Sequence, residues 1–425
     1  MQILKNLQMS KEMNMFYKNF RGIGIWVSVI SVIILLVSCS NNRKSDVMDG
    51  IIQFNQHGQY PLIDLKLSDI ADVEYVKLKD SDSAFIFQPY FSRNTYVGDD
   101  YIIVGNYTAR DYSNFGIYKF DRKGNYIDRI TGFGRGPGEF ASLAKMSVEA
   151  DSSILLFSMP EHRVVRVNSS GKYLGQWNLP RGHSEAQLLG NSVIIYDRIS
   201  KYISKNGQIV ERGAPLKAFD LSTSSVTDLL TDEYTNGIVQ DNREGPPSES
   251  KMFSHHKNLI KTKDGVYFSS VRFDTVYFIN SNLEVIPKIS VNKENPEREC
   301  YTVVAVIETD DYILLKDAYA GPDSRKSQSN YYIFIKSNNR IYQIRNDYVV
   351  GNSSMSHLFN DKISLDDTFF SLNHNLFTVY YTYDYIQELK DEIPEELQEV
   401  FSIGENDNPV LAIVKFRGIT KKLDN

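Results

Sequence analysis

A short β-strand unit recurs along this chain, and its repetition constrains the fold more than any other feature of the sequence. In each copy, a turn containing Asp, Asn or Gly leads into a short apolar run, and a second strand follows. The clearest copies occupy residues 99–104, 151–157, 190–196, 264–268, 310–315 and, more loosely, 374–379. The 50 Tyr and Phe residues also favour pleated, half-buried surfaces. The sequence therefore predicts an all-β chain.

The hairpins that follow these strands are equally clear. Three of them occupy residues 116–130, 163–177 and 275–286. Their turns contain Gly124, Gly171 and the stretch 280–282 (Asn-Ser-Asn), and Gly and Asn adopt the positive φ angles of tight turns at little cost. Antiparallel pairing of consecutive strands is expected throughout.

Six copies spaced about 40 to 75 residues apart predict a six-bladed β-propeller with loop insertions. Seven blades, a β-sandwich and two smaller barrels are the alternatives. Each sheet alone would leave an apolar face in water, so the sheets must close into a ring. Residues 72–78 and 410–416 are expected to share the closing blade. The domains are then a signal peptide at 1–38, a tether and lead-in at 39–69, and the propeller at 70–420.

The amino-terminal segment has the order of an export signal. Lys18 and Arg21 precede an apolar run at 23–37, which is shorter than the roughly 20 residues needed to span a bilayer. The run ends in Leu36-Val37-Ser38-Cys39, which resembles the lipobox of bacterial lipoproteins. We expect cleavage before Cys39 and acylation of that residue, for example by palmitate, because stable anchoring needs more than one lipid chain. The alternative is an uncleaved anchor helix with an incidental cysteine.

The mature chain is expected in the cell envelope. Residues 40–45 are polar and form a short tether, and they lack an acidic cluster of the kind that marks export to the cell surface. We therefore expect an outer-membrane lipoprotein facing the periplasm, with the cell surface as the alternative. The formal charge is −6, and removing the signal peptide makes it more negative. That balance excludes a nucleic-acid partner, which requires a basic surface.

The strongest family resemblance lies in residues 131–140, Thr-Gly-Phe-Gly-Arg-Gly-Pro-Gly-Glu-Phe, and continues through His162 and Arg163 to residue 174. This stretch looks like an NHL-type propeller repeat. With the lipobox, the chain is similar to the six-bladed β-propeller lipoproteins of Bacteroidetes. The resemblance implies a six-bladed ring and brings little information about activity.

The glycines of that motif also have a physical interpretation. A dinucleotide-binding loop is excluded because Pro137 interrupts the motif and no βαβ unit follows. A tight crossover between two blades is expected, because glycine lets backbones pass closely. Arg135 and Glu139 either form a structural ion pair or project towards a shared binding face, and the ion pair is the preferred interpretation.

Two insertions interrupt the repeat, at 231–257 and 320–327. The first lacks a strand pattern and contains further binding candidates. The full candidate set is Arg135, Glu139, His162, Arg163, Arg243, His255 and His256. Residues 384–400 predict one or two short acidic helical turns interrupted by a proline. Cys300 is expected to be a buried thiol.

No motif for a serine hydrolase, zinc protease, redox dithiol or nucleotide-binding loop occurs, and we expect neither a metal nor a cofactor. The favoured hypothesis is a non-catalytic binding or scaffold lipoprotein that recognises an envelope protein, a peptide or a glycan. The alternative is a lyase or glycoside-active enzyme on the same scaffold, because propellers host both kinds of function. Its catalytic residues cannot be assigned from the sequence.

Overall fold

The structure is a computed structural model in which Asp46–Asn425 forms one compact unit and Met1–Ser45 another. Within Met1–Ser45, only Ser45 is described. The described residues are 45–81, 84–86, 94–106, 115–149, 151–158, 161–180, 185–197, 201–203, 209–211, 213–230, 239–240, 258–271, 273–292, 301–319, 330–345, 358–359, 361–363 and 376–420.

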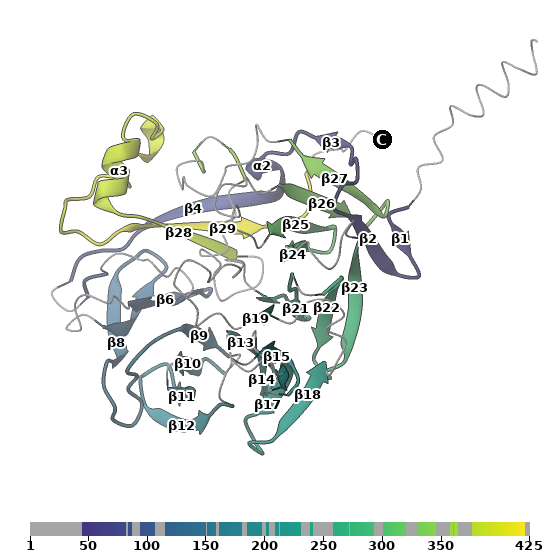
Figure 1. Cartoon of the computed structure of the whole chain (residues 1–425). Helices are drawn as coiled ribbons and strands as arrows, with labels where there is room; N and C mark the ends of the chain where they lie inside the picture. The colour runs from purple at the N-terminus through teal and green to yellow at the C-terminus, as the bar shows by residue number, and fades with distance from the viewer. Residues whose placement is uncertain are drawn as a thin grey trace, which may run out of the picture. The chain divides into compact units, whose positions relative to one another are not determined.

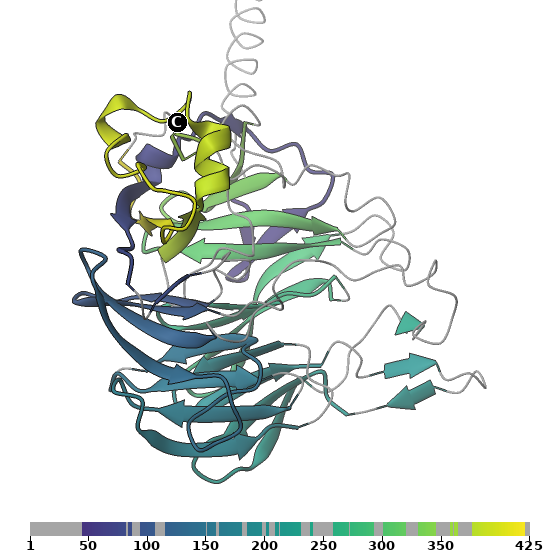
Figure 2. The ribbon, with the colours of Figure 1, turned by 90° about the vertical axis from the view of Figure 1, so that its left-hand side faces the viewer.

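Six antiparallel sheets form the blades of a β-propeller (Figure 1, Figure 2). Blade 1 contains β5 (Thr95–Val97), β6 (Tyr101–Asn106), β7 (Gly116–Asp121) and β8 (Tyr126–Gly132). Blade 2 contains β9 (Lys145–Val148), β10 (Ile154–Ser158), β11 (Arg163–Val167) and β12 (Tyr173–Asn178). Blade 3 contains β13 (Glu185–Leu189), β14 (Ser192–Tyr196), β17 (Leu216–Asp220) and β18 (Val226–Leu230).

The other three blades complete the ring. Blade 4 contains β20 (Leu259–Lys261), β21 (Gly265–Phe268), β22 (Thr275–Asn280) and β23 (Val285–Asn292). Blade 5 contains β24 (Tyr301–Glu308), β25 (Tyr312–Tyr319), β26 (Tyr331–Ile335) and β27 (Arg340–Ile344). The described strands of blade 6 are β28 (Leu376–Tyr381), β29 (Val410–Phe416) and β4 (Ala71–Lys77). The prediction of an all-β, six-bladed propeller is confirmed.

The apolar core lies between the blades. Six clusters of buried side chains each join two neighbouring sheets, including the pair formed by blades 6 and 1. In that last cluster, Leu411 of β29 packs with Ile102 of β6. Strands inside the blades, such as β10 and β14, therefore bury the side chains on both faces, which explains the continuously apolar runs in the sequence, whereas an outermost strand such as β12 stays largely exposed.

Ring closure joins segments from opposite ends of the chain. Strand β4 pairs antiparallel with β29 over seven residues, from Ala71 opposite Phe416 to Lys77 opposite Val410. This confirms the prediction that residues near 72–78 and 410–416 share a blade.

The segment before β4 adds strands to the outside of two blades. β2 (Ile51–Asn55) pairs parallel with β23 of blade 4, and β1 (Val47–Met48) forms a hairpin with β2. β3 (Leu62–Ile63) pairs parallel with β27 of blade 5. The short helix α2 (Leu67–Ile70) then leads into β4. Part of the predicted lead-in thus belongs to the blade sheets.

Two insertions carry further structure. β15 (Lys201–Ile203), β16 (Ile209–Glu211) and β19 (Val239–Gln240) form a small separate sheet. Strand β19 lies within the insertion at 231–257, which was predicted to have no strand. Between β28 and β29 lie α3 (Tyr383–Leu389) and the 3₁₀ helix η6 (Glu395–Leu397), as the pattern at 384–400 predicted.

Candidate functional site

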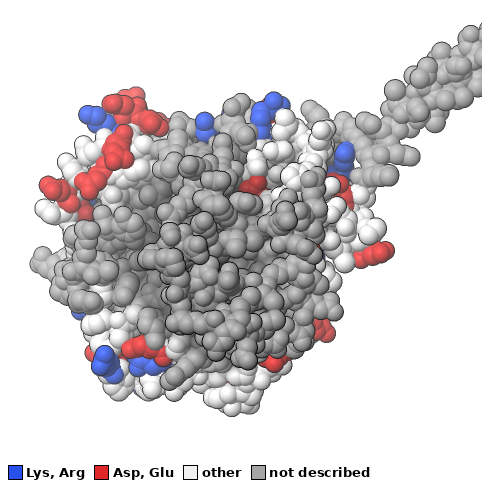
Figure 3. Space-filling model, viewed as in Figure 1, with Lys and Arg blue, Asp and Glu red and all other residues white. Residues whose placement is uncertain are grey.

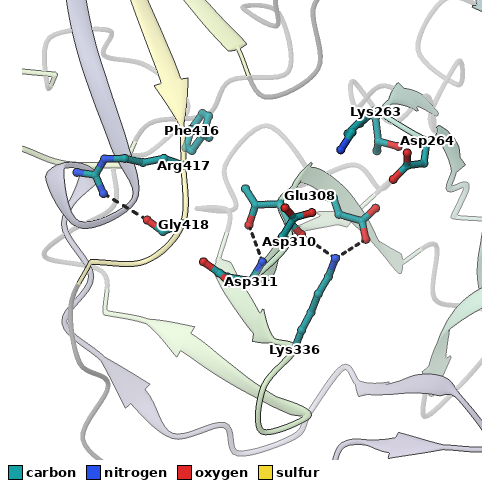
Figure 4. Close-up of a pocket in the computed structure, with 11 residues that line it drawn as sticks. Lys263, Asp264, Glu308, Asp310, Asp311, Lys336, Phe416, Arg417 and Gly418 are labelled. Atoms are coloured by element: carbon teal, nitrogen blue, oxygen red, sulfur yellow. Dashed lines mark hydrogen bonds and ion pairs between the residues drawn. The ribbon is translucent and has the colours of Figure 1, made fainter.

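A pocket of about 350 Å³ lies where turns from blades 4, 5 and 6 meet (Figure 4). Three turns and one strand end line it. They are the β20–β21 turn, the β24–β25 turn, the start of the β26–β27 turn, and the residues at the end of β29. The lining residues are Thr262, Lys263, Asp264, Glu308, Thr309, Asp310, Asp311, Lys336, Phe416, Arg417 and Gly418.

Two of these turns are built alike. Each begins with a threonine whose hydroxyl accepts backbone N–H bonds: Thr262 Oγ1 from Gly265 at 3.2 Å, and Thr309 Oγ1 from Asp311 at 3.3 Å. The hydroxyl thus replaces part of the strand ladder and closes the turn. The aspartates at the turn tips, Asp264 and Asp310, are left exposed beside the pocket.

Three of the charged side chains that line the pocket take part in ion pairs. Lys336 Nζ lies 2.8 Å from Glu308 Oε1 and also donates to the backbone oxygen of Thr309 at 2.7 Å. Arg417 Nε lies 3.0 Å from Asp72 Oδ1, on the neighbouring strand β4. These contacts fix the walls of the pocket, and they leave little net charge at Glu308 and Arg417.

The remaining charges are exposed and have no ion pair among the described residues. They are the carboxylates of Asp264, Asp310 and Asp311 and the amine of Lys263. In Figure 4, Lys263 and Asp264 lie on one side of the pocket, and Asp311 lies beside Gly418 on the other. After pairing, the pocket is therefore anionic.

A further lysine directly precedes the pocket-lining Thr262 in the sequence. Lys261 precedes the β20–β21 turn, and burial lowers the pKa of its amine, an effect that the nearby Glu149 of blade 2 partly opposes. Glu149 itself lies 2.6 Å from Arg166. Since these charges compensate one another, they do not change the sign of the pocket.

Carboxyl and phenol groups also converge inside blade 5. Asp317 accepts hydrogen bonds from Asn330 N at 2.8 Å and Nδ2 at 2.7 Å. Burial raises the pKa of Asp317. Burial also raises the pKa of nearby Tyr301, and the charge of Asp317 adds to that rise. The bonds from Asn330 occupy the carboxyl group, so this cluster has a structural role.

The candidate residues from the sequence do not line this pocket. Arg135 and Glu139 lie in the crossover between blades 1 and 2, and His162 and Arg163 lie at the start of β11. Arg163 pairs with Glu161 at 3.1 Å. The structure brings none of these four residues to the pocket. The other three candidates, Arg243, His255 and His256, lie outside the described residues. The two cysteines, Cys39 and Cys300, also lie outside them.

The preferred interpretation of Arg135 and Glu139 was wrong. Glu139 Oε2 accepts a hydrogen bond from the backbone N–H of Gly136 at 2.8 Å, and the described residues contain no ion pair between Glu139 and Arg135. The carboxylate folds back over its own loop because Gly134 and Gly136 leave room for it. The glycines therefore serve the tight crossover between blades.

Sequence reasoning missed the pocket, although a signal for it was present. Asp264 and the Asp310-Asp311 pair stand at the start of two of the repeated units. One acidic turn after another in a ring of blades places carboxylates on the same side of the molecule.

The described residues lack two further features. They contain no group of three or more His, Cys, Asp or Glu side chains placed to hold a metal ion. None of the helices among them has the length and apolar character required to cross a membrane.

Fold and pocket together define a class: a rigid six-bladed propeller that presents charged turns around a pocket. Within that class, the chain belongs to the family described as Domain of unknown function (DUF4934), which matches residues 51–415. No curated protein matches the sequence.

Two solved structures from Bacteroides are similar to the chain. One is a Bacteroides fragilis protein described as exported, with a TM-score of 0.54 and 15% identity over 87% of this chain and 100% of that one. The other is a DUF4221 member from Bacteroides vulgatus, with a TM-score of 0.46 and 12% identity over 82% of this chain and 98% of that one. At these identities the likeness extends to the fold alone, and the NHL-type character of the repeats stays a prediction.

Proposed function

We propose that this chain is an exported, lipid-anchored binding module without catalytic function, whose pocket holds a cationic segment of a peptide or protein. Export is supported by the signal-like segment before Cys39 and by the similar Bacteroides fragilis protein that is described as exported. Acylation of Cys39 supplies the membrane attachment.

The observation that carries the choice of ligand is the unpaired charge in the pocket. Three exposed carboxylates, of Asp264, Asp310 and Asp311, face one exposed amine, of Lys263. Loops on a rigid scaffold commonly carry binding function. Complementary charge then favours a ligand with lysine or arginine side chains.

A glycan fits the pocket less well. Sugar recognition commonly uses an exposed aromatic ring as a stacking surface, and the described lining contains one aromatic residue, Phe416. Its side chain is only 4% exposed, because it belongs to the core between blades 5 and 6. A peptide ligand therefore remains the proposal.

The test is binding of an oligolysine peptide to the triple variant Asp264→Asn, Asp310→Asn and Asp311→Asn. Exposed ion pairs are worth about 0.2–1 kcal/mol each, so affinity is expected to fall about tenfold. Binding is measured by calorimetry at low ionic strength, because salt screens exposed charges.

A matched control removes three carboxylates elsewhere. The control variant lies on the exposed insertion around η6 and carries Glu395→Gln, Glu396→Gln and Glu399→Gln. Its net charge changes by the same amount as that of the pocket variant. This control is expected to keep wild-type affinity. Equal weakening in both triple variants, or no peptide binding by the native protein, contradicts the proposal.

A further inference from the structure

The point at which the chain enters the propeller is fixed beside the pocket. Asp46 N donates to the backbone oxygen of Asn339 at 2.8 Å, and Asp46 Oδ2 accepts from Ile341 N at 2.8 Å. Asn339 belongs to the β26–β27 turn, whose first residue, Lys336, lines the pocket. The ends of a four-residue turn lie less than about 7 Å apart.

The tether between this point and the predicted lipid is short. Six residues, 40–45, separate Cys39 from Asp46. A fully extended chain covers at most about 3.6 Å per residue, so they span roughly 22 Å. A lipid on Cys39 therefore confines the β26–β27 turn to the neighbourhood of the membrane surface.

We propose that the anchor holds the pocket-bearing end of the propeller towards the membrane, so that its ligand is a cationic segment of a protein in the same membrane. The ligand's charge rests on the proposed function, and the orientation rests on the position of Asp46. Confining both partners to one membrane raises their effective concentration, so a weak pocket suffices for binding.

The opposite end of blade 6 supports this orientation. The insertion with α3 and η6 joins β29 at Val410, whereas the pocket lies at the Phe416 end of that strand. Seven strand residues separate the two ends by about 20 Å. The exposed acidic residues of the insertion are Asp384, Glu388, Asp391, Glu392, Glu395, Glu396, Glu399 and Glu405.

Figure 3 shows Asp and Glu side chains gathered over the region that Figure 1 labels α3. Anionic lipid repels such a surface, because like charges repel within a Debye length of about 10 Å. The insertion has eight exposed carboxylates against three in the pocket, so it is repelled more strongly and turns away from the membrane, which leaves the pocket end towards it.

The orientation is tested on the full lipoprotein, isolated with its anchor and reconstituted in phosphatidylethanolamine–phosphatidylglycerol vesicles. In a Cys300→Ser background, a fluorophore is attached either at Asp310→Cys, in the pocket, or at Glu396→Cys, on the insertion. Nitroxide-headgroup lipids quench at short range. The strand-length separation predicts about two- to threefold stronger quenching at position 310.

Two further variants sharpen the result. A flexible Gly/Ser insert of about 20 residues after Ser45 lets the domain rotate freely, so the contrast between the two positions disappears. Cys39→Ala is expected to abolish lipid incorporation and vesicle retention.

Equal quenching at the two positions, stronger quenching at position 396, or retention by Cys39→Ala overturns the inference. No peptide is present in this experiment, so its failure is distinct from failure of oligolysine binding in solution.

Discussion

Leu411→Ala is expected to lower the free energy of unfolding by about 2–5 kcal/mol, the usual cost of truncating a fully buried leucine. Leu411 is 0% exposed on β29, opposite Val76 of the closing strand, and it packs in the cluster that joins blades 6 and 1. The cavity left by the substitution would lie at the closure of the ring, where neighbouring sheets cannot shift without breaking the ladder between β29 and β4.

The measurement is urea unfolding followed by circular dichroism and by the emission of Trp177. The Trp177 indole donates to the backbone oxygen of Leu221 at 2.7 Å, across blades 2 and 3, so it reports on the far side of the ring. The matched control is Leu174→Ala on β12, where the leucine is 48% exposed and a change below about 0.5 kcal/mol is expected. Similar losses in both variants would argue against closure as the element that holds the ring.

Gly124→Ala is expected to destabilise the protein by about 2–4 kcal/mol, because it combines an unfavourable φ with a backbone collision. Gly124 has a φ of +78° in the β7–β8 turn, and a Cβ there would lie within 3.0 Å of the backbone oxygen of Lys77 at the end of β4. A backbone atom in a paired strand cannot move aside as a side chain would.

Gly50→Ala separates the two causes. Gly50 has the same φ of +78°, but a Cβ there meets no atom within 4 Å. That variant is expected to lose only the conformational part, about 1 kcal/mol. Both are compared by thermal and urea unfolding. Equal losses would show that the approach of the β7–β8 turn to β4 contributes nothing to stability.

Local patterns predicted most of this fold. Turn residues and apolar runs located the repeated strands. The segments at 72–78 and 410–416 predicted ring closure, because the last blade is complete only when these two segments pair. The hairpin at 275–286 shows where local rules fall short. Its positive φ falls on Leu283, at +64°, because the asparagine at 280 instead uses its side chain to accept backbone N–H groups of the turn.

The candidate site was harder to predict for a physical reason. A pocket built from turns of three blades depends on which turns share one end of the ring, and that relation appears only when the strands are paired. The residues chosen from the sequence, such as Arg135 and His162, stood beside a recognisable motif. The pocket carboxylates, such as Asp264, looked like ordinary turn residues.

The order of synthesis gives the closing blade a particular folding history. β4 leaves the ribosome more than 300 residues before its partner β29, and the five blades encoded between them assemble from nearby sequence. Until the carboxyl-terminal strand arrives, β4 presents a row of unsatisfied backbone groups, the kind of edge on which foreign strands add. The nascent protein is thus most vulnerable to mispairing with a second copy of itself just before it is complete.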